Sequence, residues 1–181
     1  MRSGLWIFGY GSLVWRPAFP YRERHAAAID GWERRFYQGS PDHRGVPARP
    51  GRVVTLLPAP GRRCVGVIYR VDDDDVDETL RALDVREQGG YDRVFVDALR
   101  TEGGEVVSAL LYRATPENPN YLGPASIEVI ASRVLESVGP SGPNVEYVLR
   151  LAEALRAIDA DDPHVYELER VVRSRLSGSR A

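Results

Sequence analysis

The sequence contains no lysine, a single cysteine and no long hydrophobic run. Its 24 basic residues are all arginine, which excludes Schiff-base chemistry, a lysine general base and a Walker-type phosphate loop. Cys64 cannot form an intrachain disulfide and is typical of a reducing compartment. No apolar segment reaches the length of a membrane span or of a signal-peptide core. We therefore expect a cytoplasmic protein that does not enter a membrane.

Charge and composition exclude further classes. The 26 acidic residues give a formal net charge of −2, so no broad attraction to nucleic acid is implied. The three histidines, His25, His43 and His164, lack metal-ligand spacing, so we expect no metal and no other cofactor. The 181 residues, 43% of them hydrophobic, predict a single domain over 1–181. Nothing in the sequence indicates an oligomeric state.

The order of the predicted elements indicates an α+β fold. β-rich runs bounded by Gly, Pro or Asp predict strands, and helical spacing of apolar residues predicts helices. A hairpin turn is expected at Asp30-Gly31. The expected strands cover 5–10, 26–38, 53–58, 64–71, 92–101 and 105–114, and the expected helices cover 75–87, 126–138, 145–158 and 163–176. We expect a curled, largely antiparallel sheet with the helices packed against it.

The N-terminal stretch Gly9-Tyr10-Gly11-Ser12 is the first candidate site. It contains the first two glycines of a dinucleotide-binding motif, but Val14 and Pro17 follow where a glycine and a helix are required. Ser12 does not lie in a G-x-S-x-G nucleophile motif. Two interpretations stay open: a plain structural turn, or a turn whose exposed N–H groups bind a carboxylate or a carbonyl oxygen.

Glu87 is the second candidate. It continues the apolar stripe of Val76, Leu80 and Leu83, so its carboxyl group is expected to point inward. Burial and the negative end of the helix dipole would both raise its pKa, as a general base that later returns its proton requires. The alternative is a helix that frays by residue 85 and leaves Glu87 facing solvent or paired with an arginine.

The sequence supports the other candidate site residues less strongly. Asp42-His43-Arg44 lies in a long loop rich in Gly and Pro, over 39–52, which is typical of a functional loop or lid but equally of a solvated turn. Tyr147 falls off the expected apolar face of its helix, where it could be a surface residue or could lend its hydroxyl to a pocket.

Five segments, in order, resemble the ChaC family of glutathione-specific γ-glutamylcyclotransferases. They are FGYGSLVWRP (8–17), RRFYQGSPDHRGVPARPGRVVTL (34–56), LDVREQGGY (83–91), NPNYLGPA (118–125) and GPSGPNVEYVLRL (139–151). The resemblance implies a small mixed barrel with packed helices, and an enzyme that releases 5-oxoproline and cysteinylglycine from glutathione without a cofactor.

The resemblance also implies roles for individual residues. Glu87 matches the catalytic glutamate, Tyr147 matches a tyrosine expected near the substrate, and Asp42, His43 and Arg44 match a segment over the cysteinylglycine end. The γ-glutamyl group would be held by the turn Gly9, Tyr10, Gly11, Ser12 and Leu13.

Three alternatives are weighed against this function. A γ-glutamyl amide hydrolase would release free glutamate, but it needs an activated Ser, Cys or Thr beside a base, and no such motif is visible. A non-catalytic binder of γ-glutamyl compounds would not need a base at Glu87. The substrate itself could be a related γ-glutamyl thiol in place of glutathione.

Overall fold

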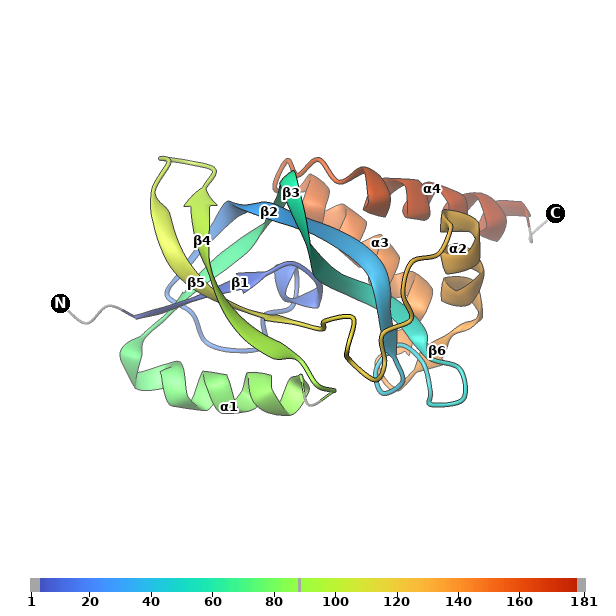
Figure 1. The fold of residues 1–181 in the computed structure, drawn as a ribbon, viewed down its shortest axis with the longest axis horizontal. Coiled ribbons are helices and arrows are strands. Elements are labelled where there is room, and N and C mark those ends of the chain that lie inside the picture. Colours follow the sequence, from blue (N-terminus) through green and yellow to red (C-terminus); the bar gives the residue numbers. More distant parts are fainter. Residues whose placement is uncertain (1–3, 88, 179–181) are drawn as a thin grey trace.

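Five strands close into a barrel in the computed structural model, which describes residues 4–87 and 89–178 (Figure 1). Their order around the barrel is β1-β3-β2-β4-β5, and the neighbours are antiparallel except for β1 and β5, which pair in parallel at Trp6–Ala109 and Ile7–Leu110. The strands are β1 Leu5–Gly9, β2 Glu23–Ser40, β3 Gly51–Val71, β4 Asp92–Arg100 and β5 Val106–Arg113, with a separate pair β6 Val138–Gly139 and β7 Gly142–Pro143. The expected α+β class with a mixed, largely antiparallel barrel is confirmed.

The helices lie in two places around this barrel. Helix α1 stands alone on one side, while α2, α3 and α4 gather on another (Figure 1). The helices are α1 Val76–Arg86, α2 Ile127–Glu136, α3 Asn144–Arg156 and α4 Pro163–Gly178, and short 3-10 turns cover η1 Ser12–Val14 and η2 Asp73–Asp75. None of the helices in the described part of the chain has the length and apolar character that crossing a membrane requires.

The expected hairpin at Asp30-Gly31 is wrong, because β2 continues through this position. β2 pairs with β3 on both sides of it, and only the register shifts between Asp30 and Trp32. Gly31 has φ of +81°, which suits a bulge as well as a turn. The two strands expected at 53–58 and 64–71 are likewise one strand, β3. Its pairing with β2 lapses between Pro58, which pairs with Trp32, and Arg63, which pairs with Asp30. Pro60 lies in this gap, where it suits the structure because proline cannot donate to a ladder.

The burial of α3 agrees only in part with its apolar spacing, which predicts that Val145, Val148, Leu149, Leu155 and Ile158 are buried; Val148 and Leu155 are. Val145, Leu149 and Ile158 are only partly buried. The fully buried positions of this helix are Asn144, Tyr147, Val148, Leu151, Ala152 and Leu155. Because α3 contacts β3 and η1 as well as the other two C-terminal helices, its buried face keeps only part of the predicted stripe and extends to positions outside it. Tyr147 is therefore a core residue, 6% exposed.

A small second core fixes α1 against the barrel. Leu83, 2% exposed, packs with side chains from β1, β3 and β5. Their buried members are Ile7, Val71, Leu110 and Tyr112. Burying one leucine contributes roughly 1.5–3 kcal/mol, so this contact holds the C-terminal end of α1, and the residue that follows it, at the barrel wall.

Candidate active site

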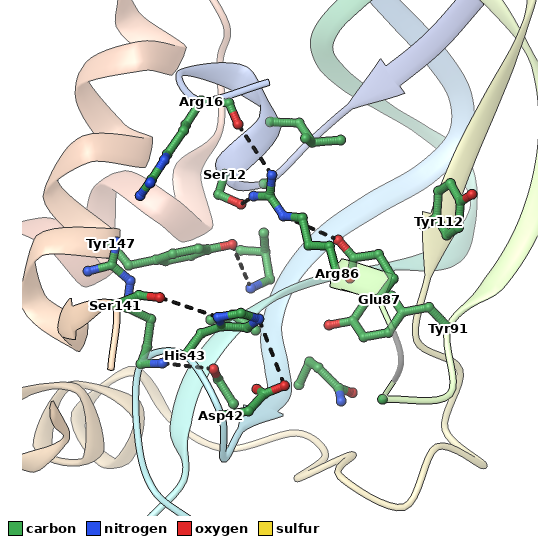
Figure 2. A pocket seen from close by; sticks show the side chains of 18 of the residues that line it. Ser12, Arg16, Asp42, His43, Arg86, Glu87, Tyr91, Tyr112, Ser141 and Tyr147 are labelled. Atoms are coloured by element: carbon green, nitrogen blue, oxygen red, sulfur yellow. Dashed lines mark hydrogen bonds and ion pairs between the residues drawn. The ribbon is translucent and has the colours of Figure 1, made fainter. Parts of the chain in front are cut away.

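A cavity of about 330 Å³ opens at the end of α1, between the barrel and α3. This volume lies at the lower end of the range for small-molecule sites. Of the residues expected to act in the site, Gly9 does not line the cavity. The others do: Tyr10, Gly11, Ser12, Leu13, Asp42, His43, Arg44, Glu87 and Tyr147. The tertiary structure thus collects candidates from four separate stretches of the chain around one space (Figure 2).

Glu87 is the residue at which α1 ends. Its backbone N–H donates to the carbonyl oxygen of Leu83 at 2.8 Å, while its own φ and ψ, −102° and 28°, have left the helical region. Its side chain is 19% exposed and pairs with Arg86 at 3.7 Å from Nε to Oε1. The carboxyl group therefore faces the cavity, as the apolar stripe indicates, and it has the arginine partner that the alternative interpretation includes.

The environment of Glu87 favours the protonated carboxyl group. The pKa of Glu87 is raised from 4.5 to about 7: burial raises it most, the charge of Arg86 partly offsets this, and the charge of Asp42 adds to the rise. Burial is the largest cause because a carboxylate loses more hydration energy than a carboxylic acid on leaving water. Near neutral pH the group is present in both forms, so it can accept a proton and return it.

The turn after β1 brings backbone to the cavity wall. A Cβ on Gly11 would lie 2.9 Å from the hydroxyl of Tyr147 and 3.2 Å from Val54, so a larger residue here would displace the Tyr147 hydroxyl. The 3-10 turn begins at Ser12, and the first N–H groups of such a turn have no partner within it. Gly9 contributes by its small size, since a Cβ there would meet Leu13 at 2.7 Å.

Two buried tyrosines, Tyr10 and Tyr147, form part of the cavity wall. Tyr10 donates from its hydroxyl to the carbonyl oxygen of Tyr112 at 2.7 Å, and burial raises its pKa well above 10. Tyr147 accepts the N–H of Val54 at 3.4 Å, and burial raises its pKa to about 12. Both rings are therefore neutral phenols at physiological pH, so they exclude water without adding charge.

The loop after β2 closes the cavity opposite Glu87 (Figure 2). Arg44 is held there by Ser40, whose hydroxyl accepts its N–H at 3.0 Å, and by the carbonyl oxygen of Pro143, 3.1 Å from Nη1. Its side chain is 8% exposed, whereas those of Asp42 and His43 are 62% and 52% exposed. Arg44 is thus a buried, hydrogen-bonded part of the cavity wall, whereas Asp42 and His43 lie at its solvent-exposed rim.

Several residues of the cavity carried no separable signal in the sequence. Arg86, Tyr91, Gln38 and Ser141 line it. All four stand in segments that resemble the ChaC family, but none belongs to a spacing that assigns it a role. Arg86 precedes Glu87, and helical periodicity places adjacent residues about 100° apart, on different faces. The two signals that could have found Arg86 are its place next to a candidate base and its place in the segment LDVREQGGY. Within residues 4–87 and 89–178, no three His, Cys, Asp or Glu side chains gather in a way that could hold a metal ion.

Known proteins resemble this chain over nearly its whole length. A family model described as ChaC-like protein matches residues 5–175. A zebrafish (Danio rerio) glutathione-specific γ-glutamylcyclotransferase 1 is 48% identical over 173 residues, which cover 93% of this chain and 88% of the relative. γ-Glutamylcyclotransferase 2-3 of Arabidopsis thaliana is 43% identical, with 97% and 92% covered.

A solved structure extends the likeness to three dimensions. The crystal structure of a yeast γ-glutamyl cyclotransferase specific to glutathione superposes with a TM-score of 0.88 at 31% identity, covering 95% of this chain and 96% of the yeast chain. The barrel and its helices are therefore arranged as in that enzyme.

Proposed function

This chain belongs to the ChaC family, and we propose that it cleaves glutathione to 5-oxoproline and cysteinylglycine, with Glu87 moving the protons. The observation that carries the proposal is a mostly buried carboxyl group, with a pKa of about 7, in a cavity beside a backbone turn. A general base is most effective when its pKa lies near the working pH.

The reaction needs no protein nucleophile. The α-amine of the glutamyl group attacks its own γ-carbonyl carbon, a C–N bond closes the five-membered ring, and the original amide bond breaks. Glu87 takes a proton from the attacking nitrogen and passes it to the leaving nitrogen of cysteinylglycine. Because the attack is intramolecular, holding the substrate in the folded conformation supplies much of the acceleration.

The wall residues then have complementary roles. We assign the turn Tyr10–Leu13 to the γ-glutamyl group, whose carboxylate and carbonyl oxygen can accept its backbone N–H groups. Tyr147 packs beside the turn, and Gly11 permits its close approach. The loop residues Asp42, His43 and Arg44 lie on the opposite side of the cavity, where the cysteinylglycine end would extend.

The decisive experiment identifies the products. The purified protein is incubated with glutathione, and 5-oxoproline, cysteinylglycine and free glutamate are quantified by mass spectrometry. Glu87→Gln should lower kcat by about 10²- to 10⁴-fold, the usual contribution of a general base, with glutathione binding retained. The matched control is Glu78→Gln, the same substitution at an exposed position of α1. Near-normal turnover by Glu87→Gln would refute the assignment of the base.

One cluster favours hydrolysis and is tested by the same assay. His43 Nδ1 lies 3.3 Å from the hydroxyl oxygen of Ser141, and His43 Nε2 lies 3.8 Å from Asp42, an order that resembles a nucleophile, a base and a carboxylate. The long second contact and the half-exposed His43 and Asp42 side chains weaken the pair through screening by water. Ser141→Ala should leave 5-oxoproline formation intact. Free glutamate that disappears in this variant would establish hydrolysis instead.

Binding without turnover is the third outcome. If glutathione binds but no product forms, a panel of γ-glutamyl thiols decides between another substrate and a binding protein. We also propose a cytoplasmic location, supported by the buried free thiol of Cys64, 3% exposed, and checked by fractionation of the source cells.

A further inference from the structure

Arg86 joins three parts of the active site through one guanidinium group. Its Nη2 donates to the hydroxyl oxygen of Ser12, its Nη1 donates to the carbonyl oxygen of Arg16 at 3.4 Å, and its Nε lies 3.7 Å from Oε1 of Glu87 (Figure 2). Ser12 and Arg86 are 74 residues apart in the chain. The guanidinium therefore connects the turn after β1 with the residue that ends α1.

The end of α1 explains why two adjacent side chains can meet in the cavity. In a continuing helix, residues 86 and 87 would project about 100° apart. Here the helix ends at Arg86, and Glu87 has φ and ψ of −102° and 28°. The changed backbone direction turns the carboxyl group toward the guanidinium, and both side chains are largely buried, at 24% and 19% exposure. Their ion pair is consequently screened less than one at the surface.

The hydrogen bond to Ser12 also determines what that hydroxyl can do. A serine hydroxyl has one proton to donate and lone pairs to accept. Because arginine can only donate, the contact uses Ser12 as an acceptor and leaves its proton for another group. Ser12 lines the cavity, so a bound carboxylate or carbonyl oxygen is the natural acceptor.

We propose that Arg86 is a positioning residue, which orients the Glu87 carboxylate and commits the Ser12 hydroxyl to donating a hydrogen bond to the substrate. The inference rests on the proposed function, since it assigns Glu87 as the base and the turn as the γ-glutamyl site. It predicts that Arg86 has two separate effects. Its charge lowers the pKa of Glu87, and its hydrogen bond to Ser12 strengthens the binding of the substrate.

The other charged and titratable groups around Glu87 have distinguishable effects. Asp42 raises the pKa of Glu87, opposite to Arg86. The phenols of Tyr10, Tyr91 and Tyr147 stay neutral near pH 7, because burial raises the pKa of each.

The remaining charged groups of the cavity wall have partners other than Glu87. Arg16, His43 and Arg44 also line the cavity, but their recorded ion pairs and side-chain hydrogen bonds within the described residues do not involve Glu87. Because the charge of Arg86 lowers the pKa of Glu87, removing its guanidinium group should raise that pKa.

The first test is the pH dependence of kcat/KM for glutathione. Its acidic limb reports the base in the free enzyme. Arg86→Met should move this limb up by about one pH unit, the effect expected on losing an opposite charge within 4–6 Å. Arg86→Lys keeps the charge and should return the limb to its original position. Arg81→Met removes the same charge from an exposed position of α1 and should leave the limb unmoved.

The second test measures coupling between Arg86 and Ser12. Ser12→Ala and Arg86→Met should each raise KM, and the double variant should lose less than the product of the two single losses, because each substitution disrupts the same contact. Arg86→Lys should fail to restore KM, since a single ammonium lacks the guanidinium fork. Losses that multiply would overturn the role assigned to Ser12.

The outcomes separate this inference from the proposed function. The position of a pH limb does not depend on the fraction of enzyme that is folded, so a purely structural role for Arg86 would lower activity without moving the limb. An unmoved limb in Arg86→Met, with 5-oxoproline still formed by the unmodified protein, overturns the positioning role alone. No 5-oxoproline from the unmodified protein would overturn the proposed function first.

Discussion

Replacing Glu87 with glutamine should stabilise the folded protein at pH 8 and change its stability little at pH 5. The pKa of Glu87 rises from 4.5 to about 7 on folding, chiefly through burial. Because the folded state then holds the proton more tightly, the favourable contribution of this group is complete below about pH 4.5. It is lost as the pH rises through about 7.

The size of the effect follows from the pKa difference. A shift of about 2.5 units at roughly 1.4 kcal/mol per unit gives about 3 kcal/mol between the low-pH and high-pH limits. At pH 5 the remaining cost is under about 1 kcal/mol by the same relation. Glutamine has nearly the same shape and cannot ionise, so the variant should recover most of this free energy of unfolding at pH 8.

Thermal unfolding of the two proteins at both pH values measures the prediction. For a chain of this size, 1 kcal/mol shifts Tm by roughly 2–4 °C, so the variant should melt about 6–12 °C higher at pH 8. Glu78→Gln, at an exposed position of α1, should show no such pH-dependent difference. An equal Tm difference at pH 5 and pH 8 would show that Glu87 is not a buried group with a raised pKa.

Two further predictions concern the framework around the site. His164 accepts the N–H of Phe36 at 3.1 Å, and burial lowers its pKa to about 4. The contribution of His164 to the stability of the fold should be complete above about pH 6.5 and lost as the pH falls through 4. An NMR titration of its ring with a midpoint above about pH 6 would contradict this. Arg34, with a 1% exposed side chain, donates to the carbonyl oxygen of Tyr10 at 2.7 Å and to Asp162 at 2.5 Å. Arg34→Met should lower the free energy of unfolding, measured in urea, by about 3–5 kcal/mol, because it leaves the Asp162 carboxylate without its partner. A loss under about 1 kcal/mol would mean that water replaces Arg34 as the partner of Asp162.

Local sequence chemistry predicts elements well where one short segment decides the outcome. The start of α2 is an example, because Ser126 accepts the N–H of Val129 at 3.4 Å as an N-cap, an interaction within four residues. Asp30-Gly31 shows the limit. Its conformational preference suits a tight turn and a bulge equally, and only pairing with β3, a distant segment, selects the bulge. The choice lies outside the segment that carries the signal.

The candidate site also has features that the sequence indicates and features that depend on the tertiary structure. The residues by themselves determine a glycine-flanked turn and motifs that resemble a known family. They predict an inward-facing carboxyl group at the end of an amphipathic helix and N–H groups presented by the turn, each beside an open alternative. Two other features depend on the fold. Tyr147 belongs to the core because two packing surfaces meet α3, and Arg86 belongs to the site because α1 ends beside Ser12. The raised pKa of Glu87 likewise exists only when distant segments of the chain exclude water from its carboxyl group, since desolvation is a property of the assembled cavity and not of any segment that forms it.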